Sequence, residues 1–572
     1  MPGLVRPEPD RAASALNRGQ RDRALTRMRE QEFDIAVVGG GVTGCGIALD
    51  AASRGLSVAL VEMHDYAAGT SSRSGKLIHG GLRYLEQLEF RLVRESLRER
   101  ALMLHRLCPH LVRPVRFLYP LEHRIWERAY VGAGLLLYDT LGGAGAVPRH
   151  RHLSRRDALR LAPALRSDRL TGAVTFYDAA FDDARHTMEL ARTAAACGAE
   201  VATAAKAVGF LREGERVSGA RVRDLETGAE FDLRARHVVN AAGVWTGEVQ
   251  GMAGGRSTFS VRASKGVHIL VPRERIRSEA AILVRAEDSV VFVRPWGRQW
   301  LIGTTDTTWA HDLSHPAANS GDIDYLLRQV NRVIDPPLTA EDIDSVYAGL
   351  RPLLAGDPKI NSRLSREHAV ESPVSGFTVI AGGKYTTYRV MAKDAVDAAV
   401  RALGRADVRP SRTHDLPLLG ARDWLTRWNT RHRLAVENGL TTARAEHLLH
   451  RYGALVDDVL ELLRFRPRLG EPIPGAEDYL LAEAHYAASH EGALHLDDVL
   501  CRRLRVSFEV RDRGVRASRA VAPVVAAVLG WDEAAIRAEL DRYRRRVEAE
   551  LASQRRPDDL SAQAAQAADQ TP

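Results

Sequence analysis

The segment Phe33-Asp34-Ile35-Ala36-Val37-Val38-Gly39-Gly40-Gly41-Val42-Thr43-Gly44 decides the fold of this 572-residue chain. An apolar strand runs directly into the pattern G-x-G-x-x-G, which Gly39, Gly41 and Gly44 form. A second apolar strand, 56–61, follows a helical stretch and ends on Glu62. This order of strand, glycine turn, helix, strand and acidic residue is typical of a βαβ unit that binds the pyrophosphate of an adenine dinucleotide.

Each glycine in this turn has a separate physical role. Gly39 permits the tight turn, Gly41 lets the backbone approach the phosphates, and Gly44 lets the helix pack closely on the strand. The helix N-terminus faces the phosphate charge, and Glu62 stands where an acid bonds the ribose hydroxyls. We therefore predict a redox dinucleotide site. Its predicted residues in this segment are Gly39, Gly40, Gly41, Thr43, Gly44 and Glu62.

Composition places the chain among globular proteins of two or three domains. Hydrophobic residues make up 45% and charged residues 27%, and no stretch of about 20 apolar residues predicts a membrane-spanning helix. The formal net charge of +8 favours an anionic substrate or membrane face. Its simplest interpretation is arginine spread over the whole surface. The sequence lacks the alternation of basic and aromatic residues that would predict nucleic-acid binding.

The sequence predicts no metal site. The four cysteines lie far apart without a C-x-x-C pair, which favours free thiols in a reducing compartment. His485, His490 and His495 recur every five residues, a spacing that distributes them around a helix rather than along one face.

Two further segments end in glycines that let backbone approach a ligand closely. The β-branched segment 237–243 ends in Ala-Ala-Gly, and the segment 377–384 ends in Gly-Gly-Lys. Between them, short strands within 267–303 predict an antiparallel sheet that covers the substrate. After about residue 415, leucine and alanine recur at helical spacing, which predicts a separate all-α domain.

Several blocks, in this order, resemble the FAD-dependent (respiratory, quinone-linked) glycerol-3-phosphate dehydrogenases. The most extensive block is Thr70-Ser71-Ser72-Arg73-Ser74-Gly75-Lys76-Leu77-Ile78-His79-Gly80-Gly81-Leu82-Arg83-Tyr84-Leu85-Glu86. The other blocks are 33–44, 238–245, 265–268, 302–306, 349–352 and 382–389. The resemblance covers roughly residues 33–506. Ala241-Ala242-Gly243 departs from the Ala-Thr-Gly of many relatives, a change that a backbone role tolerates.

The resemblance implies an α/β FAD-binding fold, Rossmann-like and of the glutathione-reductase and D-amino-acid-oxidase type. An antiparallel β substrate region and a C-terminal all-α domain complete it. The expected parts are a flexible N-terminal tail over 1–31, an FAD-dependent oxidoreductase domain over 32–410, a helical domain over 415–552 and a disordered tail over 553–572. The expected FAD-binding parts are about 32–110, 180–250 and 345–405, and the substrate region is about 111–180 and 251–345.

The resemblance also implies the residues around flavin and substrate. The implied substrate shell is Arg83, Tyr84, His268, Arg351 and Lys384. Fixed cations suit a phosphate, and arginine supplies a bidentate fork. His268, Arg351 and Lys384 are the implied catalytic residues. The further implied FAD contacts are Thr70, Ser71, Ser72, Lys76, His79, Gly80, Gly243, Gly383, Lys384 and Thr386. A helix start after Lys384 would stabilise negative charge at the flavin pyrimidine edge.

The implied reaction is oxidation of sn-glycerol 3-phosphate to dihydroxyacetone phosphate, in glycerol and glycerophospholipid catabolism. Hydride passes from C2 to FAD, and the electrons then pass to a membrane quinone. His268 is the first candidate for the base, with a hydrogen-bonding role alone as the alternative. Asp306 is expected to position the pocket. The implied location is the cytoplasm, with transient contact at the inner face of the cell membrane, and a homodimer is one option.

Three alternatives stay open at this point. The first is an oxidase on the same fold that passes electrons to O₂. The second is a 2-hydroxy-acid or amino-acid oxidase, because arginine binds carboxylates as well as phosphates. The third is a flavin-containing scaffold whose helical domain binds a partner protein. The sequence also leaves open whether His79 links covalently to the flavin, and what the helical domain does.

Overall fold

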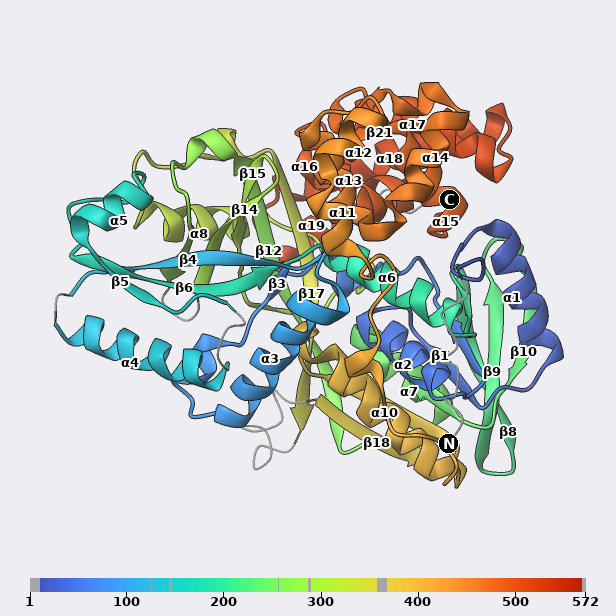
Figure 1. Cartoon of the computed structure of the whole chain (residues 1–572). Coiled ribbons are helices and arrows are strands. Elements are labelled where there is room, and N and C mark those ends of the chain that lie inside the picture. Colours follow the sequence, from blue (N-terminus) through green and yellow to red (C-terminus); the bar gives the residue numbers. More distant parts are fainter. Residues whose placement is uncertain are drawn as a thin grey trace.

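The computed structural model describes residues 11–123, 125–142, 147–255, 257–286, 290–356 and 368–567. Figure 1 shows three parts: a sheet covered by helices, a larger sheet beside it, and a cluster of C-terminal helices next to both. The chain passes between the two sheets several times, so residues distant in sequence meet at their junction.

The first sheet is the predicted dinucleotide-binding sheet. Its strand order is β18-β19-β11-β1-β2-β7, parallel except for the antiparallel edge strand β18. The bounds are β1 Ile35–Val38, β2 Val58–Val61, β7 Glu200–Ala202, β11 Val238–Asn240, β18 His368–Val374 and β19 Phe377–Gly382. All four residues of β1 are buried, because both faces of the sheet are covered.

Helices lie on both faces of this sheet. On one face, α2 (Val42–Ser53), α6 (Asp183–Ala196) and α10 (Tyr388–Leu403) enclose an aliphatic core. Gly46 allows α2 and α10 to approach, because a Cβ there would stand 3.1 Å from the Tyr388 ring. The other face carries α1 (Arg18–Glu30), α7 (Thr246–Ala253) and the small sheet β8 (Ala205–Glu213), β9 (Arg216–Asp224) and β10 (Glu230–Arg234).

The prediction of a flexible tail over 1–31 is wrong for the described residues from 11 onward. Asn17 caps α1, and Leu25 and Met28 are buried against the sheet. Arg21 donates to the Thr203 carbonyl and pairs with Asp224 at 2.5 Å. The apolar stripe of α1 is only a few residues wide, so the charged composition of the segment concealed it.

The larger sheet is the predicted substrate region. Its strand order is β16-β12-β15-β14-β13-β4-β6-β3, with β17 beside β12 and β5 beside β6. The bounds are β3 Leu77–Ile78, β4 Arg113–Leu121, β5 Arg151–Ser154, β6 Gly172–Ala180, β12 Phe259–Pro272, β13 Ala281–Arg285, β14 Val290–Trp296, β15 Gln299–Gly303, β16 Thr307–Trp309 and β17 Ser345–Gly356. The sheet is antiparallel except that β13 pairs parallel with β4.

Two pairs of helices pack on this sheet. Helices α5 (Arg155–Leu161) and α8 (Ser320–Asn331) cover one face, and α3 (Phe90–Leu102) and α4 (Trp126–Leu141) lie over the other. Strand β17 was expected in the FAD-binding part over 345–405, but it pairs with β12 over twelve residues and belongs to this sheet. It therefore brings its side chains to the junction of the two sheets.

The C-terminal domain is helical, as predicted. Its helices are α11 Trp424–Asn429, α12 Arg431–Glu437, α13 Thr442–Tyr452, α14 Val456–Phe465, α15 Leu481–His490, α16 Val506–Glu509, α17 Val515–Leu529, α18 Glu533–Ser553 and α19 Asp559–Ala567. A small hairpin, β20 (Pro472–Ile473) and β21 (Ala476–Leu480), interrupts them.

The prediction of a disordered tail over 553–572 is wrong as far as residue 567. Helix α19 lies in it, Ala562 is fully buried, and Asp559 pairs with the buried Lys265 of β12. The alanine- and glutamine-rich composition that suggested disorder also suits a short helix with a small buried face. The remaining residues, 568–572, lie outside the described part.

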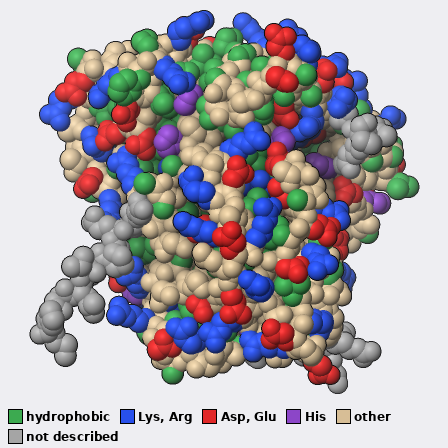
Figure 2. All heavy atoms as spheres, turned by 90° about the vertical axis from the view of Figure 1, so that its right-hand side faces the viewer, with side chains coloured by type: hydrophobic (Ala, Val, Ile, Leu, Met, Phe, Trp, Pro, Cys, Tyr) green, Lys and Arg blue, Asp and Glu red, His purple; other side chains and the backbone are tan. Residues whose placement is uncertain are grey.

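The surface agrees with the interpretation that the basic residues are spread over the molecule. Figure 2 shows Lys and Arg side chains interspersed with Asp and Glu over the face it presents. No helix in the described ranges is long and apolar enough to cross a membrane. All four cysteines are without disulfide bonds. No group of three or more His, Cys, Asp or Glu side chains among the described residues could hold a metal ion.

Candidate active site

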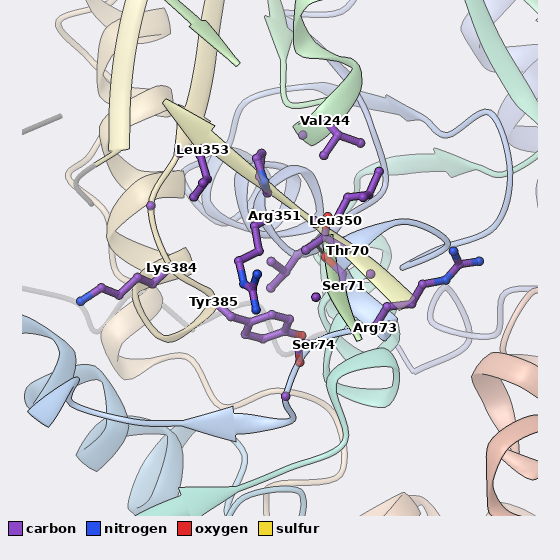
Figure 3. A pocket seen from close by; sticks show the side chains of 18 of the residues that line it. Thr70, Ser71, Arg73, Ser74, Val244, Leu350, Arg351, Leu353, Lys384 and Tyr385 are labelled. Atoms are coloured by element: carbon purple, nitrogen blue, oxygen red, sulfur yellow. Dashed lines mark hydrogen bonds between the residues drawn. The ribbon is translucent and has the colours of Figure 1, made fainter. Parts of the chain in front are cut away.

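A cavity of about 1600 Å³ opens between the glycine turn after β1 and the strands β12 and β17. Most of the predicted site residues line it. These are Gly39, Gly41, Thr43, Glu62, Thr70, Ser71, His79, Tyr84, Gly243, His268, Arg351, Gly383 and Lys384. Figure 3 shows Arg351 and Tyr385 in the middle of this lining, with Lys384 on one side and Arg73 on the opposite side.

The glycine turn forms a cradle that side chains would fill. Gly39 has φ +112°, and a Cβ there would stand 2.7 Å from the Ala241 carbonyl oxygen. A Cβ on Gly44 would stand 1.8 Å from the Gly39 oxygen. Gly41 has no side chain to cap α2, and Gly41, Val42 and Thr43 line the cavity, so the helix N-terminus favours an anion there. This cradle fits the pyrophosphate of FAD.

Glu62 is held in place by the turn itself. Its Oε2 accepts the Gly40 N–H at 2.6 Å and its Oε1 accepts the His64 N–H at 2.8 Å. Burial raises the pKa of Glu62. Gly40 and Gly44 were predicted as cofactor contacts, but neither lines the cavity. Gly40 positions Glu62, and Gly44 packs α2 on the strand end.

The loop after β2 contributes Thr70 and Ser71 to the lining. The Thr70 hydroxyl donates to the Leu350 carbonyl at 2.6 Å, which ties this loop to β17. The Ser71 oxygen accepts the Val42 N–H at 2.9 Å, and its hydrogen remains available to donate to a phosphate.

Ser72 and Lys76 were predicted as FAD contacts, but their side chains turn away from the cavity. Lys76 is fully buried, and its Nζ lies 2.9 Å from Asp183 and donates to the Ser72 carbonyl. Arg505 of the helical domain also pairs with Asp183. A buried ammonium needs a carboxylate partner. Asp183 is that partner, so the Lys76 side chain is directed to Asp183 rather than into the cavity.

His79 lines the cavity, with two predicted FAD contacts behind it. Thr386 exchanges hydrogen bonds of 3.3 Å with the His79 backbone. The Gly80 N–H donates to the Tyr138 hydroxyl at 2.8 Å, and a Cβ there would collide with Leu97. Gly80 and Thr386 therefore fix the position of His79 without lining the cavity.

His268 stands on β12 opposite Gly303 of β15 and Tyr347 of β17. Its ring stacks on Tyr347, with centroids 4.8 Å apart and planes 13° apart. A Cβ on Gly303 would stand 2.2 Å from the ring, so this glycine makes room for it. Burial lowers the pKa of His268 well below its ordinary 6.5, and the nearby charges of Arg351 and Lys76 lower it further. The imidazole is therefore neutral and able to accept a proton.

Arg351 belongs to β17, and its side chain lies along the cavity wall. One Nη donates to the Thr304 hydroxyl at 3.0 Å and to the Thr305 carbonyl at 3.1 Å. The other Nη lies 3.2 Å from Asp306. Asp306 thus orients Arg351, in agreement with its predicted positioning role.

Tyr84 and Lys384 lie together in the cavity lining. The Lys384 Nζ is 3.6 Å from the Tyr84 ring centroid, a cation–π contact. Gly81, with φ +79°, permits this approach, since a Cβ there would meet the Tyr84 ring. The side chain of Arg83, the remaining member of the predicted shell, lies outside the described part of the structure.

The sequence prediction missed three residues that support His268 from behind. Tyr347 stacks on it, and its hydroxyl donates to the Ser74 carbonyl at 2.8 Å. Phe508 of the helical domain packs on Tyr347 with ring centroids 5.4 Å apart. Arg505 forms an ion pair with Asp183, which also pairs with Lys76. The helical domain therefore packs behind the wall of the site, a role that no local motif in it indicates.

The fold and the cradle define a class, the FAD-dependent oxidoreductases. Residues 34–389 match the family described as FAD dependent oxidoreductase, and residues 411–536 match the C-terminal domain of alpha-glycerophosphate oxidase. The chain belongs to the FAD-dependent glycerol-3-phosphate dehydrogenase family.

Three similar proteins support this membership. The chain is 56% identical to a glycerol-3-phosphate dehydrogenase of Mycobacterium leprae (strain TN) over 96% of this chain and 94% of that protein. It is 36% identical to the mitochondrial glycerol-3-phosphate dehydrogenase of Bos taurus, over 94% of this chain and 76% of that protein. The solved glycerol-3-phosphate dehydrogenase of Bacillus halodurans, complexed with FAD, has TM-score 0.76 and 29% identity, over 94% and 97% of the two chains.

Proposed function

We propose that this protein oxidises sn-glycerol 3-phosphate at C2 to dihydroxyacetone phosphate. The observation that carries the proposal is that one FAD-sized cavity brings together two cations, Arg351 and Lys384, and a neutral imidazole, His268. The names of the relatives support the same substrate. Glycerol and glycerophospholipid catabolism is the setting in which this activity is required.

The side chains divide the work between binding and proton transfer. Thr304 and Asp306 hold Arg351 so that its fixed positive charge stands at the cavity wall, where it can attract a phosphate, and Lys384 adds a second charge. His268 accepts the C2 hydroxyl proton as the alcohol is oxidised. When bound, FAD supplies the acceptor for the hydride. A substrate panel tests the proposal: dye-linked oxidation should be rapid with sn-glycerol 3-phosphate and slow with glycerol, lactate or alanine.

The His268 environment predicts the pH dependence. Because its pKa is lowered, the ring stays neutral through pH 6.5, and kcat/KM should fall only in more acid solution, once the second phosphate ionisation of the substrate near pH 6 is accounted for. His268→Gln should lower the single-turnover rate of flavin reduction by about 10²–10⁴-fold. An acid limb above 6.5 that disappears in the variant would contradict the lowered pKa. A variant rate close to wild type would remove the base role.

We infer that the electrons leave to a membrane quinone at the face that carries α4. Large apolar side chains are exposed on α4 and directly before it: Ile125 is 83% exposed, Trp126 56% and Leu136 60%. Leu88 and Phe90 continue this apolar surface, and both line the flavin cavity. Figure 1 shows α4 along the outer side of the larger sheet, away from the C-terminal helices. Such a patch suits shallow contact with a lipid surface and entry of an apolar acceptor.

Polar substitution on α4 tests this face. Trp126→Gln and Leu136→Gln should each lower sedimentation with anionic lipid vesicles, and reduction of vesicle-bound quinone, by about tenfold, since burying such a side chain is worth about 1.5–3 kcal/mol. Rates with a water-soluble dye should not change. The matched control is Leu425→Gln, which alters a leucine of the helical domain that is 68% exposed. Equal vesicle binding by all three variants and wild type would exclude α4 as the contact.

An oxidase that uses O₂ is the second candidate, because the C-terminal family is named for an oxidase. Peroxide yield compared with quinone reduction separates the two acceptors. We propose a cytoplasmic protein that contacts the inner face of the cell membrane transiently. A homodimer remains a prediction, which a measurement of the molar mass in solution would test.

A further inference from the structure

A second, smaller cavity of about 60 Å³ lies between the loop 70–75 and the helical domain. Five arginines line it: Arg73, Arg502, Arg505, Arg513 and Arg546. Glu550 is the one carboxylate among its described lining residues. Helix α19 contributes Gln566 to the wall, so the segment expected to be disordered helps to close the cavity. A small space lined by so many cations is suited to an anion.

Three of these arginines are neutralised by carboxylates. Arg502 lies 2.5 Å from Asp65, Arg505 pairs with Asp183, and Arg546 lies 3.0 Å from Glu550. Since these carboxylates are already engaged, they leave little negative charge for the remaining two arginines.

Arg73 and Arg513 are the remaining two. Neither forms an ion pair within the described part of the chain. Arg513 is 2% exposed; its Nη atoms donate to the Val346 carbonyl at 2.9 Å and to Gln554 at 3.3 Å, but its Nε has no partner. Glu550 acts electrostatically on Arg546, Arg513 and Arg73 together. One carboxylate therefore serves three guanidinium groups, and this arrangement calls for a further anion.

Arg73 faces the same cavity from the opposite domain. Figure 3 shows its side chain directed away from Arg351 and Lys384. Burial and the like charges of Arg546 and Arg502 lower the pKa of Arg73 to about 10. The cations thus repel one another across the domain boundary, and an anion between them would reverse that repulsion.

We propose that this cavity binds a small tetrahedral oxyanion, inorganic phosphate or sulfate, between Arg73 and Arg513. The volume is about four times the ~15 Å³ that one water molecule needs, which suits such an ion and is too small for an organic phosphate ester. Guanidinium groups bind phosphate oxygens through paired hydrogen bonds. The bound ion ties the loop 70–75, which also lines the flavin cavity, to the helical domain.

Thermal unfolding of the full-length holoenzyme tests the site with inorganic phosphate as the probe. Phosphate at saturation should raise the unfolding temperature by about 2–4 °C relative to chloride at equal ionic strength. Arg513→Gln should lose most of this shift, and Arg351→Gln, which alters only the substrate pocket, should keep it. Equal shifts in Arg513→Gln and wild type, or loss of the shift in Arg351→Gln alone, would overturn the proposal.

A diffraction measurement covers the case in which Arg513→Gln does not fold. Crystals of the wild-type holoenzyme soaked in tungstate, a heavy tetrahedral oxyanion, should show an anomalous peak within hydrogen-bond distance of both Arg73 and Arg513. A peak in the substrate pocket with none between these arginines would overturn the proposal.

Discussion

Arg351→Gln is expected to lower kcat/KM for sn-glycerol 3-phosphate by about 10²- to 10³-fold. The guanidinium holds a fixed positive charge at the cavity wall, and each charged hydrogen bond to a phosphate contributes about 1.5–3 kcal/mol, of which part is lost to solvent at this half-buried site. Glutamine retains one donor but no charge. The measurement is steady-state kinetics with a soluble dye as acceptor.

The FAD content separates a binding effect from misfolding. In the described part of the structure the Arg351 guanidinium bonds to Ser264, Thr304, Thr305 and Asp306, none of which belongs to the glycine turn, so we expect the variant to keep its flavin absorption. The matched control is Arg221→Gln, which removes an exposed arginine of β9 paired with Asp232 and should keep wild-type kinetics. If Arg351→Gln retained wild-type kcat/KM with FAD bound, Arg351 would not bind the substrate.

Asp183→Asn is expected to destabilise the protein by about 3–5 kcal/mol, because removing one member of a buried ionic group leaves the others uncompensated. Asp183 is fully buried and neutralises both Lys76 and Arg505. It also accepts hydrogen bonds from Ser74, whose carbonyl holds Tyr347 behind His268. Flavin reduction should therefore slow as well. Denaturant unfolding and single-turnover kinetics measure the two effects.

Two comparisons sharpen this test. Adding Lys76→Met to Asp183→Asn removes one orphaned cation and should recover part of the lost stability. Asp232→Asn breaks an exposed pair and should change stability by less than about 1 kcal/mol. Equal stabilities of Asp183→Asn and wild type would show that the buried network does not hold the helical domain against the flavin site.

The sequence predicted those parts of the site that depend on local chain geometry. The turn from Gly39 to Gly44 needs a backbone that only glycine permits, so the glycine pattern predicts where the turn lies. Tyr84, His268, Arg351 and Lys384, which the family resemblance grouped together, line one cavity.

Side-chain direction could not be predicted in the same way. Lys76 and Ser72 belong to the segment that borders the cavity, but neighbouring residues of this segment point in different directions. The sequence does not show which of them point into the cavity and which point into the core. The partner that attracts Lys76, Asp183, is 107 positions away, and Arg505 is further still. Helices α1 and α19 were missed because their buried stripes are short and their composition is polar.

The central claim is tested most directly by anaerobic addition of sn-glycerol 3-phosphate to the purified protein, with the flavin absorption recorded before and after. The account predicts an oxidised flavin spectrum that bleaches at once, with one dihydroxyacetone phosphate formed per flavin. A protein without flavin bands, or a flavin spectrum that sn-glycerol 3-phosphate leaves unchanged, would contradict the account.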